Sequence, residues 1–227
     1  CQLSGYARMR PYMMHSDISE NKDIHLTTHE RNELLSIVHS PKCLNKEMLH
    51  NIRNVSYEHI PLWLHDKYNE YGLHIDYIAF FTFSEYLPAD RSFRMLHSDL
   101  DWDGSEWYPC QAALNYELTD YTTRMEWWDM TESKQTPFYP HESEKMGIRP
   151  NGIHYGSRNL TKGIAGEHTG ARKLDEVDLT QAPMLIRTDV PHIVYTSQVI
   201  LYDRVSMSIR FKENPSIGEL HAKFQRV

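Results

Sequence analysis

Cysteine is scarce in this chain of 227 residues, which contains only Cys1, Cys43 and Cys110. The three cysteines are far apart and form no CxxC pair, so the sequence does not predict a disulfide framework. There is no run of eighteen apolar residues and no visible signal-peptide pattern, so no membrane-spanning helix is expected. We therefore expect a cytoplasmic protein with no membrane partner.

Positive charge is also in short supply. The chain has 24 Lys and Arg against 31 Asp and Glu, which gives a formal net charge of −7. This balance argues against a broad nucleic-acid surface. The hydrophobic content of 40% and the charged content of 24% are typical of a globular protein, and the length suits a single domain over 1–227.

Glycine is sparse and unevenly distributed, since six of the ten glycines lie between residues 131 and 182. The same segment contains Pro137, Pro140 and Pro150. This composition predicts a long irregular insertion over about 131–182. Such an insertion is either an ordered lid or binding loop, or a disordered excursion.

Residues 1–74 are predicted to form an N-terminal arm followed by helices. Thr27-x-x-Glu30 is a capping-box pattern that predicts a helix start. A second helix is predicted after Asn45 and extends through Ile52, and a short third one follows Ile60. We expect these helices to pack on the outside of one sheet and to cover apolar residues there.

The pattern changes at Ile75, where segments rich in aromatic and β-branched residues begin. The chain is therefore predicted to be mainly β with flanking helices, and the strand-rich part covers 75–211. The tail after Phe211 is polar and is expected to be peripheral. The predicted strands are 75–86, 93–99, 110–118, 123–130, 183–188, 192–196 and 204–211.

A candidate metal site is formed by His97-x-Asp99 and the distant His192. Two imidazoles and one carboxylate suit Fe(II), and they leave other coordination positions open. His97 and Asp99 stand at the end of the predicted strand 93–99, where both side chains point the same way. His192 opens a predicted strand and is the preferred third ligand. Its rivals, in the glycine-rich segment, are His141, His154 and His168.

The order of these motifs resembles that of the Fe(II)/2-oxoglutarate-dependent oxygenases, in particular the small type common in phage and marine microbial sequence. The resemblance covers roughly 77–211. It rests on His97-x-Asp99, then the strand segments QAALNYEL and RMEWWDM, then His192 and Arg204-x-Ser206. It implies a double-stranded β-helix, also called a jelly-roll or cupin-like barrel. It also implies Fe(II) held by His97, Asp99 and His192, with 2-oxoglutarate and O2 as cosubstrates.

In this family an Arg-x-Ser motif often binds the far carboxylate of 2-oxoglutarate, and the resemblance implies that role for Arg204 and Ser206. An arginine inside a barrel is costly without an anionic partner. A ligand carboxylate meets that need, and so does a structural ion pair with Asp or Glu. Arg210 shares the strand face and is the rival, although it is expected to lie too far along the barrel. Asn115 is a further candidate to line the cofactor site.

The expected function is hydroxylation of a small molecule or a peptide residue, with release of succinate and CO2. The resemblance favours hydroxylation over halogenation because Asp99 is intact, and a halide needs that position vacated. Two alternatives stay open: a non-catalytic cupin-like binding protein, and a cupin enzyme that uses a metal without 2-oxoglutarate. Trp102, Trp107 and Tyr108 occupy a predicted loop, where they either pack beneath it or line the substrate pocket.

Overall fold

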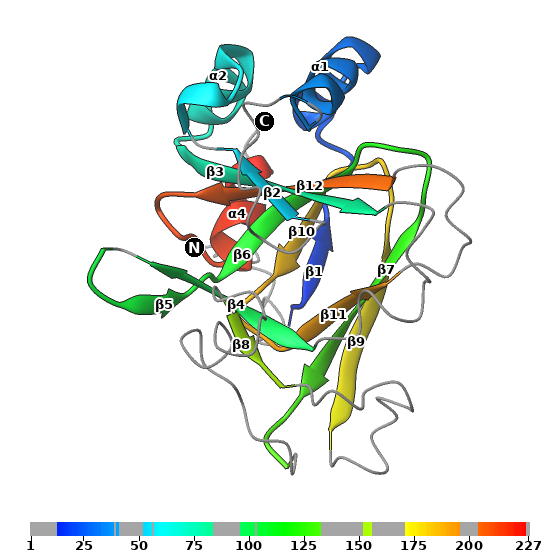
Figure 1. Ribbon diagram of the computed structural model, residues 1–227, viewed down its shortest axis with the longest axis vertical. Helices are drawn as coiled ribbons and strands as arrows, with labels where there is room; N and C mark the ends of the chain where they lie inside the picture. Colours follow the sequence, from blue (N-terminus) through cyan, green and yellow to red (C-terminus); the bar gives the residue numbers. More distant parts are fainter. Residues whose placement is uncertain are drawn as a thin grey trace, which may run out of the picture.

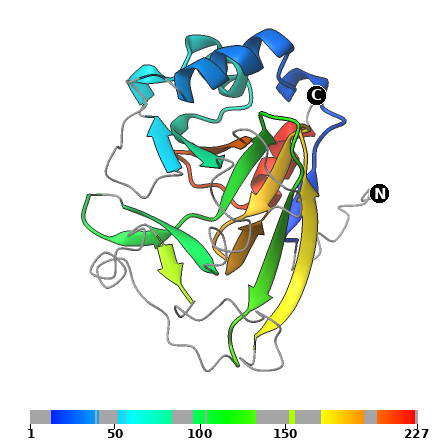
Figure 2. The same ribbon diagram turned by 45° about the vertical axis from the view of Figure 1, so that its right-hand side comes forward.

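The computed structural model describes residues 13–38, 40, 52–55, 57–83, 96–102, 104–132, 152–155, 171–195 and 204–225. Within these ranges the chain forms two six-stranded sheets, and helices cover one of them (Figures 1 and 2). The strands are β1 (His15–Asp17), β2 (Ile52–Val55), β3 (Ile75–Phe83), β4 (His97–Trp102), β5 (Trp107–Pro109), β6 (Ala112–Glu117), β7 (Thr123–Asp129), β8 (Gly152–His154), β9 (Arg172–Leu179), β10 (Met184–Arg187), β11 (His192–Tyr195) and β12 (Arg204–Phe211). The helices are α1 (Thr28–Val38), α2 (Leu62–Asn69) and α4 (Ile217–Phe224), with 3-10 turns η1 (Lys22–Ile24) and η2 (Tyr57–His59).

The first sheet has the strand order β1-β10-β6-β12-β3-β2, and every ladder in it is antiparallel. Its central strand β12 is buried along its whole length. Since side chains alternate along a strand, Val205, Met207, Ile209 and Phe211 pack into the core on the outer face. The polar residues of β12 therefore face the second sheet, as the sequence predicts; they are Arg204, Ser206, Ser208 and Arg210.

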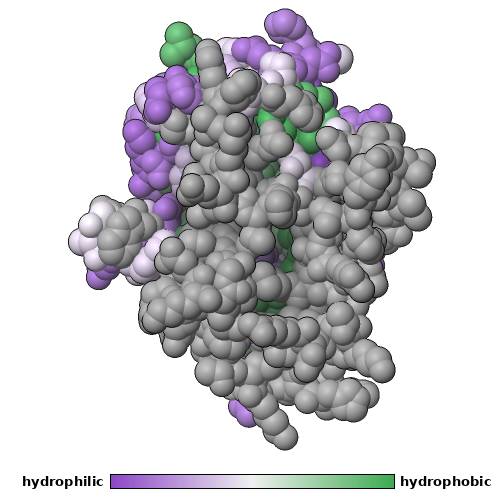
Figure 3. Space-filling view, viewed as in Figure 1, coloured by the Kyte–Doolittle hydropathy of each residue, from purple (hydrophilic) through white to green (hydrophobic). Residues whose placement is uncertain are grey.

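The three α-helices among the described residues pack on the outer face of the first sheet. Leu34 of α1, Tyr68 of α2 and Phe224 of α4 belong to the same buried cluster as the outer side chains of β12. Polar side chains gather over the outward surfaces of α1 and α2 (Figure 3). Within the described part of the chain, no helix is both long and apolar enough to cross a membrane.

The predicted helix start at Thr27 is confirmed. The hydroxyl of Thr27 accepts a hydrogen bond from the backbone N–H of Glu30, at 3.2 Å. The Glu30 carboxylate in turn accepts one from the backbone N–H of Thr27, at 2.7 Å, so two donors that helix geometry leaves unpaired are satisfied. The prediction that Ile52 continues a helix is wrong, because Ile52 begins β2, which pairs with β3. The rest of that predicted helix lies outside the described residues.

The prediction of a peripheral tail after Phe211 is also wrong. The tail forms α4, whose Ile217, Leu220 and Phe224 are buried against the first sheet. The polar residues between them occupy the exposed face of an amphipathic helix, which explains why the composition suggested a surface tail.

We expect Ser216→Ala to lower the free energy of unfolding by about 1 kcal/mol, because Ser216 is the N-cap of α4. Its hydroxyl accepts from the Glu219 N–H at 3.3 Å, and the Glu219 carboxylate accepts from the Ser216 N–H at 2.8 Å. Urea unfolding measures the change. Ser36→Ala is the matched control, since Ser36 is an exposed serine inside α1. Equal effects for both variants would mean that the cap contributes nothing.

The second sheet has the strand order β5-β4-β11-β7-β9, with β8 pairing on β4. Its strand β9 lies inside the segment 131–182 that was predicted to be an irregular insertion. That prediction is wrong for 152–154, where β8 pairs with β4, and for 172–179, where β9 pairs with β7 along nearly its whole length. Residues 133–151 and 156–170 of the segment lie outside the described residues.

A second buried cluster joins the facing surfaces of the two sheets. The first sheet contributes Ala113 and Ile186, and the second contributes Met125, Trp127 and Leu179. The space between the sheets is therefore apolar on the β7 and β9 side. It is polar on the β12 side, where the two arginines and two serines point inward. The candidate site lies in this interior.

Candidate metal centre

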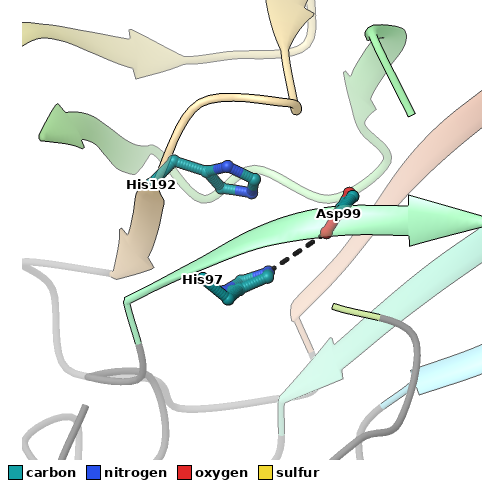
Figure 4. Close-up of side chains that lie close together, drawn as sticks. All are labelled: His97, Asp99 and His192. Carbon is teal, nitrogen blue, oxygen red and sulfur yellow. Dashed lines mark ion pairs between the residues drawn. The ribbon is translucent and has the colours of Figure 1, made fainter. Parts of the chain in front are cut away.

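His97, Asp99 and His192 meet at the place where β4 and β11 pair. His97 and His192 are direct cross-strand partners in this antiparallel ladder, so their side chains lie next to each other. Asp99 stands two residues along β4 and so projects from the same face as His97. His97 opens β4, Asp99 is the third residue of β4 and His192 opens β11, so the prediction that His97 and Asp99 end a strand is wrong. Figure 4 shows the three side chains converging.

The spacing of the three side chains suits a metal ion. The Nε2 atom of His97 lies 3.3 Å from Oδ1 of Asp99, and the His97 and His192 ring centroids are 4.5 Å apart. One ligand atom from each residue can be chosen so that all lie within 4.8 Å of one another. Ligands at right angles on a metal at about 2.1 Å stand roughly 3 Å apart. Among the described residues this is the one such group of His, Cys, Asp and Glu, and it can hold a metal ion.

His192 is oriented by its own backbone. Its Nδ1 lies 2.9 Å from the carbonyl oxygen of Val190. A carbonyl can only accept, so Nδ1 carries the proton and Nε2 is left as a bare lone pair. Burial, and then repulsion from His97, lower the pKa of His192 to about 4. The ring is therefore neutral at pH 7, as a metal ligand must be.

Asp99 is buried yet ionised. Burial pushes its pKa upward, but the Arg210 guanidinium and the neighbouring His97 and His192 outweigh burial and hold the pKa well below its usual range. The backbone N–H of Asp99 donates to the carbonyl of Thr188 at 2.8 Å, which fixes the strand at this point. The site therefore offers a carboxylate anion together with at least one neutral imidazole.

We expect the metal-free protein to lose stability between pH 6.5 and pH 4. The unfolded chain takes up a proton at His192 below its ordinary pKa of 6.5, whereas the native ring stays neutral down to about 4. The difference corresponds to about 3 kcal/mol of unfolding free energy lost across that window. Asp99 acts in the same direction but lower, since its depressed pKa stabilises the native state above 3.8 and that stability is lost as pH falls further.

Urea unfolding in the presence of a chelator measures this dependence from pH 7 to pH 4. The variant His192→Gln should show a shallower decline over the same interval, because it removes the group that titrates. Identical slopes for the two proteins would contradict the assignment of the decline to His192.

Arg210 lies directly against the triad. Its Nη2 donates to Oδ2 of Asp99, and both side chains are buried. The prediction that Arg210 lies too far along the barrel is therefore wrong. The triad lies at the Arg210 end of β12, where Arg210 contacts Asp99 near the start of β4.

Arg204 occupies the other end of the same strand face. Its Nη2 donates to Oε1 of Glu117 at 2.5 Å, and both side chains are 1% exposed. Burial raises the pKa of Glu117, and Arg204 offsets only part of that rise. The Thr123 hydroxyl donates to the same oxygen at 2.7 Å. Of the alternatives left open for Arg204, the ion pair with a protein carboxylate is present in the structure.

The remaining predicted cofactor residues lie between the two arginines. Ser208 donates to the side-chain oxygen of Asn115 at 2.7 Å, across the β12–β6 ladder. Ser206 is buried on the same face, opposite Glu117. All four predicted residues thus line one face of the first sheet, and of these four Arg210 is the one that contacts a triad residue.

No protein family model matches the chain, and no match is found among curated proteins. The interpretation of the site therefore depends on its residues and their arrangement.

The rival third ligands are not placed by the structure. His141 and His168 lie outside the described residues, as does the side chain of His154. The backbone of His154 pairs with that of His97 in the β4–β8 ladder. Among the described side chains, His192 is the histidine that joins His97 and Asp99.

The predicted loop after Asp99 is instead a hairpin. β4 continues to Trp102 and pairs with β5, with Trp102 opposite Trp107 and Asp101 opposite Tyr108. Trp107 is 40% exposed. Trp102, its partner, is three residues along the strand from Asp99, or about 10 Å. Trp107 is therefore a partly exposed residue of the hairpin, and its position on the strand lies away from the triad.

Sequence reasoning missed Glu117 and Thr188. Glu117 ends β6 in the segment NYEL, where an acidic residue suggests a strand end rather than a buried partner for Arg204. Thr188 is fully buried, and its hydroxyl donates to the Cys110 carbonyl at 2.6 Å. The signal in the sequence was the pair of arginines itself. Two arginines on one inward-facing side of a strand require buried anionic partners.

Proposed function

We propose that this protein is an Fe(II)- and 2-oxoglutarate-dependent oxygenase that hydroxylates a small molecule or a peptide residue. The observation that carries the proposal is the convergence of His97, Asp99 and His192 at one point between two sheets. Two histidines and one carboxylate on one side of a metal leave the opposite positions open. Oxygenases of this kind use those positions for a chelating cosubstrate and O2.

The strand pairing supports a double-stranded β-helix as the scaffold. Taken in chain order, the eight strands concerned are β3, β4, β6, β7, β9, β10, β11 and β12. The first pairs with the eighth, the second with the seventh, the third with the sixth and the fourth with the fifth. This is the pairing of one long hairpin rolled into two facing sheets, which is how a jelly roll is built.

The charge in the interior supports a dianionic ligand. Asp99 and Arg210 form one buried ion pair, and Glu117 and Arg204 form another. Each pair is formally neutral, so a divalent metal would bring two uncompensated positive charges. Buried charge is costly without a partner. A dicarboxylate that chelates the metal supplies two negative charges, and 2-oxoglutarate is such a ligand.

When bound, Fe(II) would activate O2 for the oxidative decarboxylation of 2-oxoglutarate, which yields succinate and CO2 and leaves one oxygen atom for the substrate. The chain's own residues position the metal-binding side chains and exclude water from the site. Val190 fixes the His192 ring, and Arg210 holds the Asp99 carboxylate. Trp127, the cross-strand partner of His192 in β7, is fully buried and closes one side of the site.

A cupin-like metal protein that does not use 2-oxoglutarate is the second candidate. The observation in its favour is that Arg204 and Arg210 each pair with a carboxylate of the chain itself. The cosubstrate would have to compete with Glu117 for Arg204. Under this alternative the triad still binds a metal, and the chain functions as a binding protein or as a different metalloenzyme.

Anaerobic titration with Fe(II), with and without 2-oxoglutarate, separates the candidates. We expect a visible charge-transfer band only when Fe(II) and 2-oxoglutarate are both present. Succinate is the matched control, because it lacks the keto oxygen needed for chelation and should give no band. Fe(II) binding without a band would favour the second candidate. Absence of Fe(II) binding would overturn both.

A further inference from the structure

The two oxygens of the Asp99 carboxylate have different neighbours. Oδ1 lies 3.3 Å from Nε2 of His97, on the side where the triad converges. Oδ2 accepts a hydrogen bond from Nη2 of Arg210. The guanidinium therefore occupies one oxygen and leaves the other directed at the metal position.

Arg210 is itself held in place by buried neighbours. Its Nη1 lies 3.5 Å from Oγ1 of Thr188, and its backbone is paired with Tyr77 of β3. The Thr188 carbonyl accepts from the Asp99 N–H, and the Asp99 carbonyl accepts from the Cys110 N–H at 3.1 Å. Arg210, Asp99, Thr188 and Cys110 are all buried, so this set of contacts has little freedom to move.

We propose that Arg210 is a positioning residue, which makes Asp99 bind the metal through Oδ1 alone. A carboxylate can bind a cation through one oxygen or through both. Binding through both would occupy a further position next to the two histidines. With Oδ2 held by Arg210, three of the six positions of an octahedral metal would stay open, which is the number that a two-atom chelator and O2 would require. This inference rests on the proposed metal site.

Charge and geometry predict opposite results when Arg210 is removed. The positive charge of Arg210 repels a divalent metal ion. From charge alone, its loss should therefore make the metal bind more tightly. Loss of a residue that orients a metal ligand should instead weaken binding, by about 10- to 100-fold. The sign of the change in affinity therefore tells the two effects apart.

The test uses Co(II) as the probe, anaerobically and without 2-oxoglutarate, on the full chain. Titration gives the affinity, and the visible spectrum of bound Co(II) reports the coordination geometry. We expect Arg210→Met to weaken Co(II) binding by about 10- to 100-fold and to change the spectrum. Arg210→Lys keeps the charge and one donor but loses the planar fork, so its affinity should lie between those of wild type and Arg210→Met.

Arg204→Met is the matched control. It makes the same change on the same strand face, and it also breaks a buried ion pair. It should destabilise the fold, as Arg210→Met does, yet leave Co(II) affinity and spectrum unchanged. If the two variants weaken Co(II) binding equally, the effect is general damage to the fold and the inference is wrong.

The remaining outcomes are equally decisive. Tighter Co(II) binding by Arg210→Met would show that charge dominates, and would overturn the positioning role. If Arg210→Met does not fold, Arg210→Lys decides: an unchanged affinity and spectrum would overturn the inference. Normal Co(II) binding by every Arg210 variant would sink this inference alone. Absence of Co(II) binding by the wild-type protein would sink the proposed metal site and this inference together.

Discussion

Replacement of any one of His97, Asp99 and His192 by alanine is expected to abolish stoichiometric Fe(II) binding while the protein stays folded. Each supplies a different ligand atom, and all three atoms come within 4.8 Å of one another. The two ligand side chains that remain are too few to hold a divalent metal ion tightly. Anaerobic titration followed by metal analysis after gel filtration measures the retained iron.

The three variants differ in their cost to the fold. The side chain of His97 is 23% exposed, so its removal should change stability least. Asp99→Ala leaves the Arg210 guanidinium buried without its partner, which costs about 3 to 5 kcal/mol in comparable cases. Asp99→Asn keeps the shape and one acceptor for Arg210, so it is the better variant for testing the metal alone.

His65→Ala is the control for the histidine variants. His65 is a buried histidine of α2 and lies outside the triad. It should retain full iron content. If His192→Ala retains iron while His154→Ala or His168→Ala loses it, then the third ligand is not His192 and the metal centre has to be redrawn.

Local patterns were sufficient for part of this site. The alternation in RVSMSIRF predicts which residues of β12 face inward, because side chains alternate along any regular strand. The two-residue spacing of His97 and Asp99 places both on one face for the same reason. The motif Asp189-Val190-Pro191 predicts a turn before His192, and the structure has β11 beginning at His192.

Contacts between distant segments could not be predicted in this way. Arg204 and Glu117 are 87 residues apart, and Arg210 and Asp99 are 111 apart. Each arginine needed a buried anion, but which carboxylate it meets depends on the register of β12 against β6 and on how the two sheets face each other. The sequence therefore predicts that each arginine needs a buried carboxylate, but it does not identify that carboxylate. For this reason the prediction that Arg204 lies closer to the triad than Arg210 is wrong.

The compositions of β9 and α4 do not indicate regular structure. β9 reads RKLDEVDL, and its charged residues form ion pairs with charged side chains of β7, as Asp178 does with Arg124. An edge strand with one solvent-exposed face can be this polar. Because β9 follows a glycine-rich stretch, the sequence predicts it as part of the irregular insertion. α4 was missed for a related reason, since only one of its faces is apolar.

Replacement of Arg204 by alanine is expected to raise the 2-oxoglutarate requirement strongly, while Fe(II) binding stays nearly intact. A dicarboxylate with one end on the metal needs a fixed cation at its other end. Loss of a charge-assisted pair of hydrogen bonds should cost about 2 to 5 kcal/mol, or roughly thirty- to several-thousand-fold in affinity. Titration of the chelate band with 2-oxoglutarate at saturating Fe(II) measures the change.

The strand face between the two arginines is consistent with this role. Arg204 and Arg210 are six residues apart on β12, or about 20 Å between Cα atoms. Ser206 and Ser208 lie between them, and their small side chains occupy little space. Arg210 contacts the metal-site carboxylate, so Arg204 is the cation placed farther along the same face.

Glu117 provides the sharper version of this test. It holds Arg204 in the ligand-free protein, so a cosubstrate carboxylate would have to displace it. Burial already raises the pKa of Glu117. Glu117 would therefore take up a proton readily once the Arg204 guanidinium moves from it to a bound ligand. Glu117→Gln should therefore tighten 2-oxoglutarate binding, whereas Arg204→Ala weakens it.

If Glu117→Gln has no effect and Arg210→Ala loses the cosubstrate at saturating metal, the role passes to Arg210. If none of the three variants changes 2-oxoglutarate affinity, Arg204 is purely structural and the metal protein that does not use 2-oxoglutarate becomes the better account.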